Sequence, residues 1–156
     1  MIKEIIPYNM PHNTPIRFRC AEYNKDSLFL SSFHIHNEIE IIYITNGTLI
    51  CRYNNKEKTL SKGDIIIFNK NSIHETEANS ETSLYSLQIP IEFFLADNSQ
   101  LLYALTDTQS VLCLKKEDTH YNEIKGYMEN FSLHRYNEEH ISREYVRICL
   151  PCYFFS

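Results

Sequence analysis

The chain has 156 residues, enough for one domain with a single hydrophobic core. Its formal net charge of −5 excludes strong binding of DNA by this chain alone, because such affinity comes mainly from Lys and Arg side chains that neutralise phosphates. No run reaches the roughly 18 apolar residues that span a bilayer, so no membrane partner is expected. The 5 scattered cysteines are typical of reduced thiols and predict a cytoplasmic protein.

The first part of the chain predicts an arm followed by a β domain. Residues 1–15 contain three prolines and little periodicity, which favours an extended N-terminal arm. Residues 16–114 contain short runs rich in β-branched and aromatic residues, separated by turn signals. Asn54-Asn55 and the segment Ser61–Asp64 mark two of these turns. This pattern predicts a mainly β, antiparallel fold of seven or eight strands, either a sandwich or a barrel.

Beyond residue 114 the hydrophobic period changes from that of strands to that of helices. Residues 115–156 predict two helices, near 119–135 and 138–150, and Pro151 ends or kinks the second. Each helix has an apolar face, which either packs on the barrel or meets a second copy of the chain. We expect part of both faces to form a homodimer interface, with these candidate contacts: Ile124, Met128, Phe131, Ile141, Tyr145 and Ile148.

Four side chains stand out as a candidate site. His34, His36 and Glu40 have the same parity, so on a strand they would point to one face, and His74 lies on a later hairpin. Imidazole and carboxylate groups in this combination suit Fe, Mn, Ni, Cu or Zn. Three interpretations stay open: a divalent transition metal, a polar binding pocket without metal, or a hydrogen-bonded structural cluster. Glu38 shares the parity, but we expect it to be a surface acid.

The spacing of these residues resembles two motifs of the cupin family. The stretch "HIHNEIEIIYITNG" is similar to the first motif, in which His34, His36 and Glu40 are followed by Gly47. The stretch "GDIIIFNKNSIH" is similar to the second motif, which ends at His74. The second motif is incomplete: cupins usually carry Pro, Gly and Asn where this chain has Asn69, Asn71 and Ala78.

A narrower resemblance covers nearly the whole chain, most clearly residues 28–95. An arm, a cupin with "LSKGDIII" between its motifs, and two trailing helices resemble the N-terminal domain of AraC-type transcription regulators. The resemblance implies a jelly-roll barrel, also called a double-stranded β-helix, that binds a small effector and dimerises through its helices. In that family two helix-turn-helix units follow and contact DNA. No such region occurs here, so we expect this chain to be an excised sensor domain.

Two functions of different classes follow. The first is a non-enzymatic ligand-sensing and dimerisation domain that binds a small, sugar-like effector at His34, His36, Glu40 and His74. The alternative is a stand-alone cupin enzyme, such as a dioxygenase or sugar isomerase, whose metal would be held by the same four residues. On either function, we expect the four side chains to converge in one cavity of the barrel.

Overall fold

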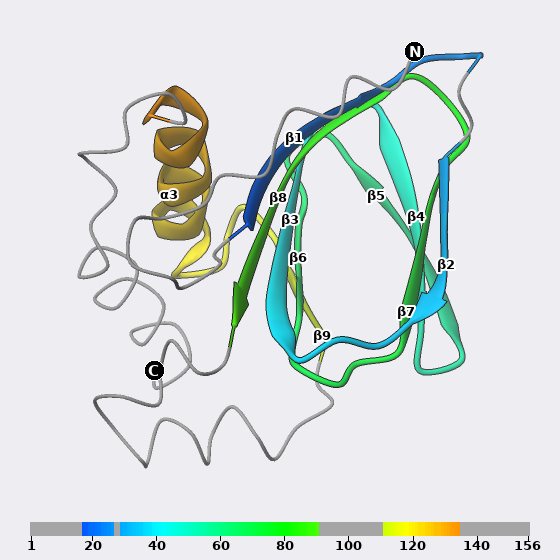
Figure 1. The fold of residues 1–156 in the computed structure, drawn as a ribbon. Helices are drawn as coiled ribbons and strands as arrows, with labels where there is room; N and C mark the ends of the chain where they lie inside the picture. The colour runs from blue at the N-terminus through cyan, green and yellow to red at the C-terminus, as the bar shows by residue number, and fades with distance from the viewer. Residues whose placement is uncertain (1–16, 27–28, 91–110, 135–156) are drawn as a thin grey trace.

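A computed structural model describes residues 17–26, 29–90 and 111–134 (Figure 1). Nine strands and one helix are found within these residues, and they keep the labels of Figure 1. Their bounds are β1 Arg17–Tyr23, β2 Phe29–His34, β3 Glu38–Asn46, β4 Thr48–Tyr53, β5 Lys56–Ser61, β6 Ile65–Phe68, β7 His74–Ala78, β8 Thr82–Pro90, β9 Val111–Leu114 and α3 Tyr121–His134.

The strands form two facing antiparallel sheets. One sheet has five strands in the order β1-β8-β3-β6-β9, and the other has four in the order β2-β7-β4-β5. Consecutive strands therefore often lie in different sheets, as in a jelly roll. Figure 1 shows α3 beside the five-stranded sheet, on the side away from the four-stranded sheet. The predicted mainly β, antiparallel fold is confirmed.

The five-stranded sheet is buried on both faces, and β3 shows this most clearly. Ile39, Ile41 and Tyr43 of this strand belong to the hydrophobic core that includes α3. Ile42 and Ile44 point the other way, into the core shared with the four-stranded sheet. Side chains alternate along a strand, so one strand lines the barrel interior and supports the helix at the same time.

Both predicted turns are present. Asn54 and Asn55 have φ angles of 49° and 57°, and they join β4 to β5 in a tight hairpin. Positive φ at both central residues is the requirement of a type I′ turn, and Asn tolerates it better than most residues. Gly63 has φ of 93° in the second turn, where Asp64 N donates to Ser61 O at 2.9 Å.

Helix α3 confirms the first of the two predicted helices, and the second lies outside the described residues. The face of α3 that carries Ile124, Met128 and Phe131 is buried, with relative exposures of 1%, 0% and 3%. These side chains pack on the five-stranded sheet, where the ring of Phe131 stacks on Phe18 with centroids 5.6 Å apart. Prediction of these three residues as dimer contacts is therefore wrong, because side chains already buried within one chain have no surface left for a partner.

Other predictions concern residues that the structure does not describe. The N-terminal arm and the other three candidate dimer contacts, Ile141, Tyr145 and Ile148, lie outside the described residues. Among residues 17–26, 29–90 and 111–134, no helix has the length and apolar character needed to cross a membrane.

Candidate functional site

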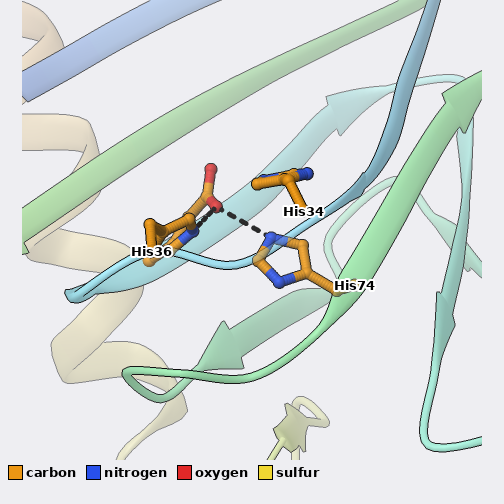
Figure 2. Close-up of side chains that lie close together, drawn as sticks. His34, His36 and His74 are labelled. Atoms are coloured by element: carbon orange, nitrogen blue, oxygen red, sulfur yellow. Dashed lines mark hydrogen bonds and ion pairs between the residues drawn. The ribbon is translucent and has the colours of Figure 1, made fainter.

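The four predicted site residues come together at one end of the barrel. His34 ends β2, His36 lies in the connection to β3, Glu40 is in β3, and His74 begins β7. One potential ligand atom from each residue lies within 4.8 Å of the others. Figure 2 shows the three imidazole rings gathered around one carboxylate, with dashed lines from His36 and His74 to the same oxygen.

The route to this convergence differs from the expected one. His34 and His36 are not neighbours on a single strand, because the chain leaves the four-stranded sheet after His34 and enters the five-stranded sheet at Glu38. Equal parity on one strand is therefore the wrong reason for their proximity. The connection between the two sheets turns His36 back toward Glu40, and their ring nitrogen and carboxylate oxygen are 3.0 Å apart.

Glu40 is the centre of the hydrogen-bond network. Its Oε2 accepts from Nε2 of His36 at 3.0 Å and from Nε2 of His74 at 3.2 Å, and its Oε1 accepts from the hydroxyl of Ser86 at 3.0 Å. Burial by itself would raise the pKa of the Glu40 carboxyl, but the hydrogen bonds from His36 and His74 outweigh burial and hold that pKa well below its usual range. Glu40 is therefore a buried carboxylate that stays ionised.

Backbone carbonyls orient all three imidazole rings. Nδ1 lies 2.8 Å from Ser32 O in His34, 3.0 Å from Glu38 O in His36 and 2.9 Å from Ser72 O in His74. A carbonyl oxygen only accepts, so each Nδ1 carries a hydrogen, and in His36 and His74 Nε2 is the ring nitrogen that faces Glu40. Metal-binding histidines are usually held in this way, by a second hydrogen bond from the ring nitrogen that does not bind the metal.

His74 is held on two further sides despite the incomplete second motif. Its ring is fully buried and stacks on Phe68, with centroids 3.9 Å apart and planes 8° from parallel. Asn71, which replaces the usual glycine of the motif, has φ of 59°. Asparagine supplies here the left-handed backbone that glycine ordinarily provides. Asn71 N also donates to His36 O at 2.9 Å, which joins the two loops that carry the site.

Glu38 was expected at the surface, and this prediction is wrong. Its side chain is only 22% exposed and pairs with Arg17 Nη2 at 3.1 Å, while its second oxygen lies 3.5 Å from His36 Nδ1. Burial tends to lower the pKa of His36, but the hydrogen bond and charge of Glu40, helped by Glu38, raise that pKa above its ordinary value. The parity that Glu38 shares with Glu40 is consistent with its position beside His36.

A small cavity of about 80 Å³ adjoins the cluster inside the barrel. Sequence reasoning missed most of its polar lining, which comes from β1, β2, β7 and β8: Arg19, Tyr23, Ser31, Thr76, Ser86 and Gln88. The alternation of β1 and β8 indicated which of their residues share a face, but no sequence signal showed that this face meets His34, Glu40 and His74. A larger surface groove of about 420 Å³ beside the β4–β5 hairpin includes none of the four cluster residues.

The donor set has the composition of a site that could hold a divalent transition metal. Donors about 2.0–2.2 Å from one ion are separated by roughly 3.0–3.4 Å when they occupy adjacent coordination positions. The distances of 3.0 and 3.2 Å from Glu40 Oε2 to the two Nε2 atoms are those of its hydrogen bonds, and the four potential donor atoms lie within 4.8 Å of one another. Three imidazole nitrogens and one carboxylate oxygen also form the kind of ligand set that Zn, Ni, Mn or Fe accepts.

Two facing antiparallel sheets, with a histidine and glutamate cluster at one end of their interior, define this chain as a cupin. The family model of the AraC-like ligand binding domain matches residues 18–144. This match covers most of the chain, and the protein belongs to that family.

The solved structures agree with this fold. Two structures of ToxT from Vibrio cholerae are similar, with TM-scores of 0.59 and 0.58, identities of 13% and 12%, and 88% of this chain covered in each. They cover 54% and 52% of the ToxT chains, so this chain spans about half the length of ToxT. The structure of KdgF from Halomonas sp. is also similar, with a TM-score of 0.46, 16% identity, and coverage of 57% of this chain and 76% of that one. No curated protein sequence matches the chain.

Proposed function

We propose that this chain is the ligand-sensing domain of an AraC-type transcription regulator and binds its effector in the barrel interior. Membership of the AraC-like ligand binding domain family supports sensing over catalysis. The observation that carries the proposal is the convergence of His34, His36, Glu40 and His74 beside an internal polar cavity. Ligand sites are commonly concave and present a few convergent polar groups, as this one does.

The volume of the cavity limits the effector. Water occupies about 30 Å³ per molecule in the liquid, so 80 Å³ corresponds to roughly three water-sized groups. A sugar-like effector, the class expected from sequence, is larger than this volume and would have to extend beyond the cavity. A small polar ligand fits the cavity as it stands, because hydrogen-bonding side chains from both sheets line it.

The regulator would act in the cytoplasm as a homodimer and contact DNA through a region outside this chain. With a net charge of −5, the chain offers little attraction for phosphates, so a separate basic domain is the reasonable partner for DNA. The face of α3 that packs on the sheet is already occupied, so a dimer interface would use other surfaces. Ile141, Tyr145 and Ile148 of the second predicted helix stay candidates for that interface.

The proposal is tested by thermal stability in a ligand screen with sugars, small organic acids and divalent metal ions. A ligand at 100 times its Kd stabilises the folded state by about 2.7 kcal/mol, which raises the Tm by roughly 5–10 °C for a chain of this size. Ser86→Ala should weaken that response, since Ser86 lines the cavity and bonds Glu40. Glu22→Gln, an exposed change on β1, is the matched control. Chemical conversion of the stabilising compound would argue for an enzyme instead.

A further inference from the structure

We propose that the surface groove beside the β4–β5 hairpin is a second ligand site, and that it binds small aromatic amines, which combine a neutral planar ring with a cationic ammonium group. The groove has a volume of about 420 Å³, within the roughly 300–1,000 Å³ that is typical of pockets for organic ligands. Among the described residues, it shares no lining residue with the interior cavity. This site is therefore additional to the one of the proposed function and independent of it.

Exposed apolar side chains form part of the groove. Phe33, near the end of β2, is 57% exposed, and Ile73, just before β7, is 55% exposed. Two large apolar side chains on one concave surface favour a ligand that removes their area from water. The ring of Tyr53 also lines the groove, and an edge-to-face contact with Phe68 holds it, with centroids 6.0 Å apart. A ring that is already fixed loses little freedom when a ligand packs on it.

Arg52 adds a flat surface that is also fixed. Its Nε lies 2.7 Å from Glu57 Oε2, its Nη1 lies 2.6 Å from Glu75 Oε1, and its Nη2 lies 2.7 Å from Glu77 Oε2. The strand register sets this arrangement, because Arg52 is opposite Glu57 on one side and Glu75 on the other. The N–H groups of a guanidinium lie in its plane, so the carboxylates occupy its edge and leave its faces for stacking on an aromatic ring. The groove therefore meets Arg52 mainly as a stacking surface for the ring of the ligand.

The charges at the groove favour a cation over an anion. Two basic and three acidic side chains lie in the groove or are paired with Arg52, and together they leave a net charge of −1: Arg52, Lys56, Glu57, Glu75 and Glu77. The side chain of Glu57 lines the groove and is 58% exposed. An ammonium group on a short arm can pair with this carboxylate while its ring stays among the apolar side chains. A carboxylate on the same arm would be repelled.

The groove lies against the segments that carry two residues of the histidine and glutamate cluster. Phe33 directly precedes His34, and Ile73 directly precedes His74. His74 is also opposite Tyr53 in the pairing of β7 with β4, at the end of the four-stranded sheet where the hairpin turns (Figure 1). A ligand that packs on Phe33 and Ile73 therefore restrains the backbone beside both histidines.

Binding is tested with two probes that share a ring and differ in charge, tryptamine and indole-3-acetate. Each is titrated into the 156-residue chain at neutral pH and followed by the NMR signals of the backbone amides. We expect tryptamine to bind with a Kd of about 1 mM or below, and indole-3-acetate to bind at least about tenfold more weakly. The signals of Phe33, Ile73 and the Asn54-Asn55 turn should move.

Three outcomes of this titration would overturn the proposal. They are a Kd of tryptamine above about 10 mM, equal binding of the two probes, and signal changes centred on Ser86 and Gln88, which line the interior cavity instead. A failure of the groove would leave the proposed function intact, because that function rests on the interior cavity.

The apolar contacts are tested by truncation of exposed side chains, which should leave the fold intact. Phe33→Ala and Ile73→Ala should each weaken tryptamine binding by at least about fivefold. Leu30→Ala and Ile35→Ala are the matched controls, since these side chains are 55% and 57% exposed and do not line the groove. Their Kd should stay within about twofold of wild type. Equal effects of all four substitutions would overturn the assignment of the groove.

The charge preference is tested by Glu57→Gln. This variant should bind tryptamine more weakly and indole-3-acetate more tightly, each by about twofold or more, because one negative charge leaves the groove. Glu22→Gln removes the same charge from an exposed position on β1 and should change neither Kd. If Glu57→Gln moves both Kd values in the same direction, or moves neither, the aromatic amine is the wrong class of ligand.

Discussion

Glu40 and His74 meet across the barrel, with Oε2 of the first 3.2 Å from Nε2 of the second, although 34 residues separate them in the chain. Glu40 belongs to the five-stranded sheet and His74 to the four-stranded sheet. Both side chains are buried. This contact joins the two halves of the fold at the candidate site, so the stability of the barrel and the chemistry of the site depend on the same residues.

Glu40→Ala should lower the free energy of unfolding by about 3 kcal/mol, because it leaves two buried donors, on His74 and Ser86, and one part-buried donor, on His36, without their acceptor. Glu40→Gln keeps one acceptor oxygen, so its free energy of unfolding should fall by less than that of Glu40→Ala. Urea denaturation at neutral pH measures both variants against Glu22→Gln, an exposed change on β1. A Glu40→Ala protein within about 0.5 kcal/mol of wild type would show that the network contributes little to stability.

Met128→Ala should lower the free energy of unfolding by about 2–5 kcal/mol, since Met128 is completely buried between α3 and the five-stranded sheet. Leu133→Ala on the same helix is the control. Leu133 is 75% exposed, so its truncation should change stability by less than about 0.5 kcal/mol. Denaturant midpoints and m-values of both variants give the measurement. A change in dimerisation by Met128→Ala with unaltered stability would contradict the placement of this face inside the monomer.

Gly47→Ala and Gly126→Ala should change stability in opposite directions. Gly47 has φ of 74°, and an added Cβ would collide with the carbonyl oxygen of Glu81 and lie 2.9 Å from Cα of Thr82. We expect a loss of at least about 2 kcal/mol, from the clash and the left-handed backbone together. Gly126 lies inside α3, where a Cβ would have no atom within 4 Å, so alanine there should stabilise by roughly 0.5–1 kcal/mol. Thermal unfolding distinguishes the two variants by the direction in which the Tm changes. Equal changes in Tm would be inconsistent with the surroundings of the two glycines.

Tyr43→Phe should become more stable than wild type in alkaline solution. Burial, with nearby Tyr121, Glu129 and Tyr85, raises the pKa of Tyr43 to about 12 from its ordinary 10.0. Between pH 10 and about pH 12 the phenol of Tyr43 therefore stays neutral in the folded state while it ionises in the unfolded state. The stability that the neutral phenol allows is fully present below pH 10, and the free energy of unfolding falls as the pH rises toward 12. At about pH 11 the free energy of unfolding of Tyr43→Phe should exceed that of the wild type by about 1 kcal/mol. Denaturation at about pH 7 and about pH 11 checks this, and a pH-independent difference would argue against it.

The sequence by itself determined the class of fold and the four residues of the candidate cluster. The spacing of His34, His36, Glu40 and Gly47 indicated a cupin, and the strand texture, the Asn54-Asn55 turn and the first helix were all readable from local pattern. Such features depend on neighbours within a few residues: alternation along a strand, helical period, and the backbone freedom of Asn and Gly. They carry over into the structure because local and tertiary preferences agree there.

Only the tertiary structure decided how these elements are used. The apolar face of α3 looks the same in sequence whether it meets a partner or a sheet, and the packing of Phe131 on Phe18 of β1 shows that it meets the sheet. Asn71 looks like a defect in its motif until its φ of 59° shows that it supplies the same turn. The polar lining of the cavity depends on pairings such as that of Arg19 with Ser86, between strands 67 positions apart in the chain. Contacts of this range leave no local pattern, because strand order and register, not spacing, bring the residues together.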